Sequence, residues 1–574
     1  MEESSSKQRS PVSAVSEAYA KQEARQDPAL FISLKDKSAA LAEARKLEAG
    51  GGEGRPLYGK VLAVKDNIDV KGLPTSAACP AFAHESEHSA FVVDRLETAG
   101  AIVLGKTNLD QFATGLVGVR SPYGVPRNVL RDDLIPGGSS SGSAVAVAAG
   151  IVDIALGTDT AGSGRIPAGM NGIVGLKPTL GLLSATGMVP ACRTLDTISI
   201  FARDVRTAMA ALQVAAAYDE ADAYSRRLPT PALTTAPPVF RVGVPRIDQR
   251  QFFGDAAAEK AYADDLDFLA GLGGQIVELD FEPFFKVARL LYEGPWVAER
   301  YAATKALIER DPEAFHPITR KIIGGAKSLT AVSAFEAMYR LAALKRQTQP
   351  VLSSIDCLAV PTIPRFYTVA EVEADPITLN SNLGTYTNFV NLLDLCAISV
   401  PVGMRSDGLP SSLTLIGRAG ADGLLAGIGA RLTGENVDRP RRAAAGRIEI
   451  AVIGAHLSGL PLNGELTALG GVFERTVETT PSYRLFALPG TVPPKPGLLR
   501  VEAHTGTSIK GEVWSLEPEG FGRFVAGIPS PLGIGTLSFS DGTTAKGFLV
   551  ESQAVAAARD ISSFGGWKDF LASA

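Results

Sequence analysis

The chain has 574 residues, with 56 basic and 61 acidic side chains and a formal net charge of −5. This balance excludes the strongly basic surface of a nucleic-acid-binding protein, and a hydrophobic content of 45% excludes a disordered chain. The length is too great for one compact core, so we expect two or three domains.

Histidine and cysteine are scarce, with only five and four copies. No two cysteines form a C-x-x-C pair, which argues against a structural zinc site and a redox motif. Four cysteines in a chain of this length do not make a disulfide framework, so we expect reduced, buried thiols at Cys79, Cys192, Cys357 and Cys396. The sequence therefore predicts neither a metal site nor a cofactor.

The sequence shows no sign of export or of membrane insertion. Its first ten residues, MEESSSKQRS, are polar and lack the apolar core of a signal peptide. The longest apolar stretch, residues 144–157, contains Asp153 and is shorter than the roughly 18 residues that a membrane span needs. We expect a cytoplasmic protein with neither a membrane nor a nucleic acid as its partner.

In chain order, residues 13–50 have a helical pattern around an extended FISL segment, and short β-rich runs then alternate with helices. This alternation predicts an α/β domain around a mixed or parallel sheet. The expected helices are residues 90–100, residues 255–272 and one long region, 285–345, broken near His316. The expected strands are residues 31–34, 61–64, 101–108, 241–246, 275–281, 357–364 and 397–403.

The composition changes near the end of the chain. Residues 439–447, RPRRAAAGR, are basic and rich in alanine, as in a linker, and β-rich segments follow them. Asp541 and Gly542 separate two alternating segments and predict a β-hairpin. We therefore expect a catalytic domain over residues 1–440 and a smaller domain over residues 446–574.

The Gly/Ser-rich segment 137–165 is the most informative one. A flexible linker would not run directly into AVAVAAG, and no phosphate-binding glycine pattern is present. Residues 138–142 match G-x-S-x-G, but a charged segment with a proline precedes them instead of the buried strand that a nucleophile elbow needs. A Ser-His-Asp triad stays open, because folding can bring any of the five histidines near these serines.

Lys65 offers a base other than histidine. It ends the apolar segment VLAV, and burial disfavours a charged ammonium group and lowers the pKa of a lysine. A single lysine at the end of a strand is more often a surface charge, so this interpretation depends on other residues nearby.

Those residues come from a family resemblance over about residues 25–435. AVKDNI, GKTNLDQFA, GGSSSGSAVAVAAG and GTDTAGSGRIPA together resemble the amidase signature family; they occupy residues 63–68, 105–113, 137–150 and 157–168. The resemblance implies an α/β fold whose mixed central sheet is flanked by helices, and a Ser-cisSer-Lys triad. It implies that Ser163 is the nucleophile, that Ser139 is the bridging serine on a cis peptide, and that Lys65 is the base.

The same resemblance implies an oxyanion hole made of backbone N–H groups. These groups belong to Thr160, Ala161, Gly162 and Ser163. We expect Asp159 and Arg165 to brace this loop rather than to react.

The last part of the chain resembles a second family. GAHLSGLPLNGEL, GEVWSLEPEGFGRF and RDISSFGGWKDFL, at residues 454–466, 511–524 and 559–571, are similar to the C-terminal domain of the allophanate hydrolase family. This resemblance implies a small α+β domain of the γ-glutamyl-cyclotransferase-like barrel type. Residues 521–529 lack the acid that cyclotransferases carry after this strand, which argues against that activity. The family implies decarboxylation of N-carboxycarbamate, with His456 as the candidate residue, or a role in assembly of a homodimer.

Allophanate is a small anionic substrate, and its recognition requires a cation. The resemblance points to Tyr292 and Arg300, which are eight residues apart and would face the same side of one helix. It also places Gly115 and Gly118 at this pocket. The implied function is hydrolysis of allophanate to ammonia and carbon dioxide overall. The amidase subunit of a tRNA-dependent amidotransferase and a general small-amide amidase remain as alternatives.

Overall fold

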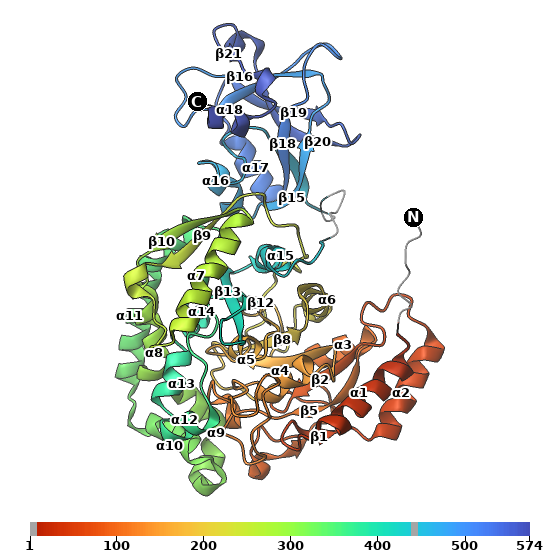
Figure 1. Cartoon of the computed structure of the whole chain (residues 1–574), viewed down its shortest axis with the longest axis vertical. Coiled ribbons are helices and arrows are strands. Elements are labelled where there is room, and N and C mark those ends of the chain that lie inside the picture. The colour runs from red at the N-terminus through yellow and green to blue at the C-terminus, as the bar shows by residue number, and fades with distance from the viewer. Residues whose placement is uncertain (1–8, 438–442, 444–445, 574) are drawn as a thin grey trace.

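The computed structural model describes residues 9–437, 443 and 446–573. Most of the expected linker, residues 439–447, and most of the polar first ten residues therefore lie outside the described residues. The described chain forms a large body around one sheet and a smaller lobe that contains the C-terminus (Figure 1). The domain limits at residues 440 and 446 stay a prediction.

The large body is built around an eleven-stranded sheet in the order β1-β5-β2-β6-β8-β7-β12-β13-β11-β9-β10. Strand β2 is parallel to both of its neighbours, β5 and β6, and β9 is parallel to β10 and β11, whereas the other neighbouring pairs are antiparallel. The expected mixed sheet is thus confirmed. The strands are β1 (Phe31–Leu34), β2 (Val61–Lys65), β5 (Ile102–Thr107), β6 (Ile154–Asp159), β7 (Val174–Lys177), β8 (Thr197–Ala202), β9 (Phe240–Pro245), β10 (Gly274–Leu279), β11 (Cys357–Pro361), β12 (Leu395–Met404) and β13 (Pro410–Arg418).

Helices pack around this sheet, with α1 and α2 beside the β1–β5 edge and α8 and α11 near the opposite end (Figure 1). A short hairpin of β3 (Pro74–Thr75) and β4 (His84–Glu85) lies apart from the sheet. The helices are α1 (Pro11–Arg25), α2 (Lys37–Gly50), α3 (Phe91–Thr98), α4 (Ser141–Ala148), α5 (Ile166–Asn171), α6 (Val205–Ala215), α7 (Ala256–Gly271), α8 (Glu282–Glu293), α9 (Val297–Arg310), α10 (Pro317–Gly324), α11 (Ala331–Ser353), α12 (Val369–Ala374), α13 (Thr378–Leu383), α14 (Phe389–Leu392) and α15 (Asp422–Leu432).

The expected long helical region over residues 285–345 is wrong in one respect. The chain there forms four helices, α8 to α11, and not one helix with a single break near His316. Gly294 and Pro295 end α8, because a proline disfavours helical backbone at the residue before it and cannot donate its own N–H.

The Gly/Ser-rich segment leads into the centre of the sheet. Helix α4 begins at Ser141 and is buried over its first turns. A Cβ atom on Gly142 would lie 2.5 Å from the carbonyl oxygen of Leu30 and 2.7 Å from the backbone nitrogen of Asn108, so only glycine lets α4 approach this closely. The carboxyl ends of the parallel strands β2 and β6 therefore lie beside the segment that precedes α4, and ligands commonly bind at such ends.

The smaller lobe contains a five-stranded sheet, β15-β18-β14-β20-β19, and a three-stranded sheet, β17-β16-β21. The outer strands of the larger sheet meet at one end, where Thr479 pairs with Phe539 and the N–H of Ser540 donates to the carbonyl of Glu478, so the sheet curves as a small barrel does. Its elements are β14 (Ile448–Val452), α16 (Asn463–Ala468), β15 (Val472–Glu478), β16 (Tyr483–Ala487), β17 (Pro496–Arg500), β18 (Lys510–Leu516), α17 (Pro518–Ala526), β19 (Leu532–Ser538), β20 (Thr544–Val550), β21 (Arg559–Asp560) and α18 (Trp567–Ser573).

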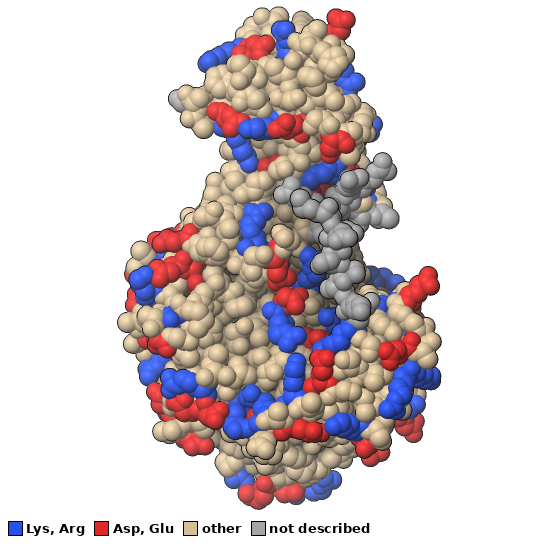
Figure 2. All heavy atoms as spheres, turned by 45° about the vertical axis from the view of Figure 1, so that its right-hand side comes forward, with Lys and Arg blue, Asp and Glu red and all other residues tan. Residues whose placement is uncertain are grey.

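The hairpin predicted at Asp541 and Gly542 is confirmed, because Ser538 in β19 pairs with Thr544 in β20 across this turn. Basic and acidic side chains are interspersed on the face shown in Figure 2. Within the described ranges, no helix combines the length and the apolarity that crossing a membrane requires.

Candidate active site

Lys65 is the last residue of β2, and its side chain is completely buried, as the sequence predicts. Its Nζ atom donates to Ser139 Oγ at 2.7 Å, to Ser140 Oγ at 2.9 Å and to Thr158 Oγ1 at 2.7 Å. No carboxylate among the described residues forms an ion pair with it. Burial lowers the pKa of Lys65 from 10.5 to about 7, so a large fraction of this amine is neutral near neutral pH.

Ser139 is held in an unusual backbone geometry. The peptide bond between Gly138 and Ser139 is cis, as the family resemblance implies. A Cβ atom on Gly138 would lie 2.0 Å from Asp110 Oδ2, and the N–H of Asp110 donates to the carbonyl of Ser139 at 3.0 Å. Only glycine therefore fits before Ser139, and the Ser139 hydroxyl is held against Lys65.

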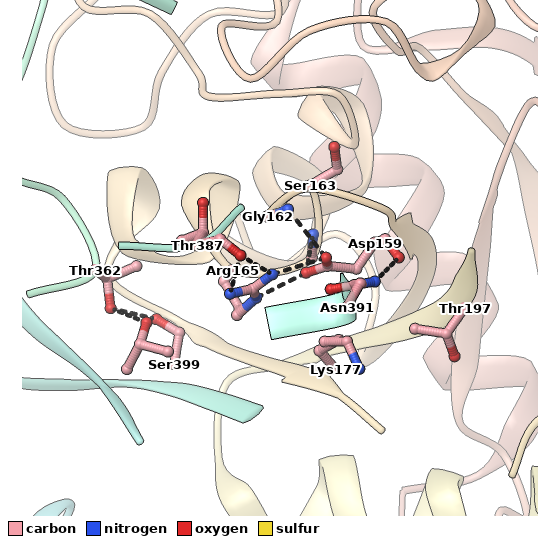
Figure 3. A network of polar contacts seen from close by, with 12 residues as sticks. Asp159, Gly162, Ser163, Arg165, Lys177, Thr197, Thr362, Thr387, Asn391 and Ser399 are labelled. Carbon is pink, nitrogen blue, oxygen red and sulfur yellow. Dashed lines mark hydrogen bonds and ion pairs between the residues drawn. The ribbon is translucent and has the colours of Figure 1, made fainter. Parts of the chain in front are cut away.

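Ser163 lies in the loop between β6 and α5 and is 2% exposed. Its hydroxyl points away from Asp159 and Arg165 in Figure 3 and donates to the carbonyl of Gly115 at 3.5 Å. In the part of the chain that the structure describes, no hydrogen bond joins Ser163 to Ser139. Of the two hydrogen bonds that the expected triad requires, the one between Lys65 and Ser139 is formed. The one between Ser139 and Ser163 is not formed.

The loop before Ser163 offers backbone donors. The N–H groups of Thr160, Ala161 and Ser163 have no acceptor among the described residues. The N–H of Gly162, by contrast, donates to Asp159 Oδ1 at 3.0 Å. Of the four expected oxyanion donors, Gly162 is therefore already occupied, and the other three are available to a ligand.

Asp159 and Arg165 brace this loop from below (Figure 3). The guanidinium of Arg165 donates from Nε and from one terminal nitrogen to the two Asp159 oxygens, both at 2.9 Å, and both groups are fully buried. Asp159 Oδ2 also accepts the N–H of Gly164 at 3.1 Å, and Arg165 reaches the carbonyl of Thr387 at 3.2 Å. This bidentate pair fixes the turn that presents Ser163.

Asp196 is a second, half-buried acid at this loop, and no sequence motif pointed to it. Its carboxylate accepts the Thr160 hydroxyl at 2.5 Å and the N–H groups of Ala191 and Cys192. Burial raises the pKa of Asp196 to about 6. The available signal was weak: an acid directly before the apolar strand TISIFA.

Tyr292 and Arg300 meet, but not on one helix. Tyr292 lies at the end of α8 and Arg300 in α9, because Gly294 and Pro295 separate the two helices. The Arg300 guanidinium carbon lies 6.0 Å from the centre of the Tyr292 ring. Arg300 is 3% exposed and donates to the Ala113 carbonyl at 3.1 Å, so it is not a surface charge.

His456 lies far from these residues in the sequence, in the loop after β14. It lines a cavity of about 250 Å³ in the smaller lobe. One ring nitrogen, Nε2, lies 2.9 Å from Glu465 Oε2, and the ring stacks on Phe548 with 5.3 Å between the ring centres. The acid-free segment 521–529 contributes to the same cavity, whose carboxylate comes from Glu465 in α16.

The comparisons with known proteins agree with this arrangement. The model of the amidase family matches residues 14–426, and the model of the allophanate hydrolase C-terminal domain matches residues 448–572. The chain belongs to the amidase family. The first match covers the triad candidates and the second covers His456.

Two relatives are similar to this chain along nearly its whole length. The urea amidolyase of Lachancea kluyveri is 43% identical over 96% of the chain, which covers only 31% of that protein. A solved structure of a Kluyveromyces lactis allophanate hydrolase superposes on this chain with a TM-score of 0.77 and 40% sequence identity. The match covers 98% of this chain and 97% of that chain. The chain therefore spans about a third of the length of the curated urea amidolyases that it matches.

A third relative matches a smaller share of the chain. A glutamyl-tRNA(Gln) amidotransferase subunit of Methanosarcina mazei is 34% identical over 68% of this chain and 86% of its own length. The smaller lobe thus distinguishes this member of the amidase family from the amidotransferase protein.

Replacing Asp159 by Asn tests the brace. The variant keeps the shape of the side chain but leaves the buried Arg165 charge without a partner, which typically costs about 3–5 kcal/mol. We expect the free energy of unfolding, measured by chemical denaturation, to fall by about this amount. Asp394→Asn is the control, because its ion pair with Arg226 is 41% exposed on both sides and contributes at most about 1 kcal/mol. Equal losses in the two variants would contradict the role of the brace.

Proposed function

We propose that this amidase-family chain hydrolyses allophanate, with Ser163 as nucleophile and Ser139 and Lys65 as its proton relay. The observation that carries the proposal is the buried hydrogen bond between Lys65 and Ser139, 2.7 Å long, beside the loop of Ser163. The allophanate hydrolase C-terminal domain at residues 448–572 supports this substrate over glutamine and over simple amides.

In the proposed reaction, neutral Lys65 accepts the proton of Ser139, and Ser139 accepts that of Ser163 as Ser163 attacks the terminal carbonyl of allophanate. The Ser163 hydroxyl must first turn from the Gly115 carbonyl towards Ser139. The relay then protonates the leaving nitrogen, and ammonia departs. Water hydrolyses the acyl-enzyme to release N-carboxycarbamate.

The negative charge on the carbonyl oxygen needs donors that are already in place. The N–H groups of Thr160, Ala161 and Ser163 serve as the oxyanion hole in this proposal, since Gly162 is bonded to Asp159. One such donor is typically worth about 2.7–4 kcal/mol of transition-state stabilisation. Asp196 positions Thr160 through its hydroxyl.

Tyr292 and Arg300 bind the substrate in this proposal. Arg300 offers the planar, permanently charged donor that suits a carboxylate, and the Tyr292 hydroxyl adds a neutral donor. Arg300 donates to the Thr114 hydroxyl, and Thr114 directly precedes the Gly115 carbonyl that holds Ser163. Tyr292 joins this group through its contact with Arg300.

His456 is proposed to assist the second step in the smaller lobe. Loss of carbon dioxide breaks a C–N bond of N-carboxycarbamate, and the electron pair remains on nitrogen, which must take up a proton. Burial lowers the pKa of His456, so its protonated form gives up a proton readily. That form would supply the proton, leaving carbamate, while Glu465 holds the ring through Nε2. Carbamate then yields the second ammonia and carbon dioxide.

We further propose that the enzyme works in the cytoplasm as a homodimer whose assembly involves the smaller lobe. The four cysteines are buried and unpaired, as is usual in a reducing compartment.

Ammonia release from allophanate tests the proposed function. Wild-type protein should release ammonia from allophanate but not from glutamine, and Ser163→Ala should lose about 10⁴-fold or more of the rate because the nucleophile is gone. Ser143→Ala is the matched control: this serine lies in the same Gly/Ser-rich segment but bonds Thr107 and the Leu156 carbonyl. An inactive wild type, or a fully active Ser163→Ala, would refute the proposal.

The pH profile tests the role of Lys65. Because only the neutral amine can accept a proton, kcat/KM should fall about tenfold per pH unit below the Lys65 pKa of about 7 and level off above it. Asp196→Asn separates the two titrating groups. Removing this negative charge destabilises the ammonium, lowers the Lys65 pKa and moves the fall to lower pH. If the fall disappeared instead, Asp196 and not Lys65 would be the group that titrates.

His456→Gln tests the second step. Glutamine keeps a polar nitrogen near Glu465 but cannot deliver a proton, so the first ammonia should appear at the wild-type rate while carbon dioxide release lags by about 10²-fold. A pH-indicator assay coupled to carbonic anhydrase follows the carbon dioxide. His84→Gln is the control, because His84 is exposed. Carbon dioxide released by His456→Gln as fast as by wild type would exclude the role of His456.

A further inference from the structure

The buried arginines fall into two groups. In one group, a carboxylate pairs with each guanidinium: Arg165 with Asp159, Arg405 with Asp255 and Asp407, and Arg475 with Glu449. The other group is Arg120, 1% exposed, and Arg300, 3% exposed. Neither forms an ion pair with any residue in the described ranges. Burying a charge without a counter-ion is unfavourable, so these two residues require an explanation.

The two arginines of the second group share one residue. Arg120 donates from a terminal nitrogen to the Thr114 carbonyl at 2.9 Å, and Arg300 donates to the Thr114 hydroxyl at 3.2 Å. Arg120 also bonds the Pro376 carbonyl at 2.6 Å, but its Nε has no acceptor within the described chain.

Burial lowers the pKa of Arg120, the Asp110 carboxylate opposes this shift, and the positive charge of Arg300 adds to it. Burial also lowers the pKa of Arg300, but nearby groups, Asp196 and Glu299 among them, raise it more. Two like charges are thus held close together in a place with little water.

The Asp110 carboxylate favours the charged form of Arg120 but makes no direct ion pair with either guanidinium. Asp110 uses its two oxygens to accept the backbone N–H groups of Gly118 and Arg120, both at 2.9 Å, rather than a guanidinium. The carbonyl oxygens that Arg120 contacts are neutral and could be held equally by a neutral amide. A structural role alone therefore does not account for the charge of Arg120.

Arg120 lies close to the nucleophile and to a cavity. Ser163 Oγ donates to the Gly115 carbonyl, and a Cβ atom on Gly115 would lie 3.2 Å from a terminal nitrogen of Arg120. Arg120 also lines a cavity of about 290 Å³ together with Tyr292, Asn380 and one acid, Glu293, whereas Arg300 and Ser163 are not among its lining residues. This volume is enough for a small acylurea or acylamide.

We propose that Arg120 is a specificity-determining residue, which forms with Arg300 a two-guanidinium subsite for the carboxylate of the substrate. The proposal rests on the proposed function and names the feature that selects a carboxylate-bearing amide over a neutral one. The substrate anion supplies the direct ion-pair partner that neither guanidinium has among the described residues. A neutral amide of the same shape leaves both guanidiniums without that partner.

A matched pair of ligands tests this subsite without turnover. Malonamate has the shape of allophanate with a methylene in place of the central nitrogen, and malonamide replaces its carboxylate by a neutral amide. Calorimetry in the Ser163→Ala background measures the Kd of each. Arg120→Gln removes the charge but keeps an amide donor for the Thr114 carbonyl, whereas Arg120→Lys keeps the charge. Arg226→Gln, at an exposed ion pair, is the control.

We expect Arg120→Gln to weaken malonamate binding about tenfold or more, as for a lost hydrogen bond to a charged group, and to leave malonamide binding within about twofold. Arg120→Lys should retain most of the malonamate affinity. Malonamide binding also reports whether each variant is folded around the site. Equal weakening of both ligands by Arg120→Gln would assign it a purely structural role, and no weakening of either would overturn the subsite.

The outcome for the subsite is separate from that for the proposed function. If wild-type protein fails to hydrolyse allophanate but Arg120→Gln still loses malonamate selectively, the proposed reaction is refuted and the anion subsite stands. If wild type hydrolyses allophanate and Arg120→Gln binds malonamate unchanged, the reaction stands and Arg120 is not part of its specificity.

Discussion

An ammonium group removed from water needs compensation, and at Lys65 three hydroxyl groups supply it in place of a carboxylate. Hydroxyl groups stabilise the charged form less than an ion pair would, so burial dominates and the pKa of Lys65 falls to about 7. The sheet makes this possible, because Lys65 ends a strand that lies between two parallel neighbours. A lysine in this state can act as a base without the help of histidine.

The same distinction between paired and unpaired charges runs through the whole site. Asp159 and Arg165 neutralise each other and form a rigid brace below the Ser163 loop. Arg120 and Arg300 have no such carboxylate partner among the described residues, although they are almost equally buried. A pair of matched charges stabilises a loop, whereas in our proposal the two arginines without an ion pair bind the carboxylate of the substrate. In the smaller lobe, His456 and Glu465 form a separate polar pair on a cavity with both polar and apolar walls.

Local patterns predicted much of the fold. The alternation of short apolar runs and helical segments located the strands β2, β5, β9, β10 and β11 close to their observed limits, because periodicity and burial follow directly from the order of side chains. The helical region after residue 282 was less well predicted. Its residues favour helix throughout, and only Gly294 and Pro295 indicated that α8 ends and α9 begins there. This break changes how Tyr292 and Arg300 meet.

The residue types of the site were evident from the order of amino acids: the family motifs identified Lys65, Ser139 and Ser163, and the apolar run before Lys65 predicted its burial. What each group contacts became evident only in the folded chain. Asp196 belongs to a segment with no recognisable pattern, and no motif singled out Arg120; their partners are distant in sequence, as with the Pro376 carbonyl. Whether a buried charge is paired depends on distances across the fold, which the order of residues does not encode locally.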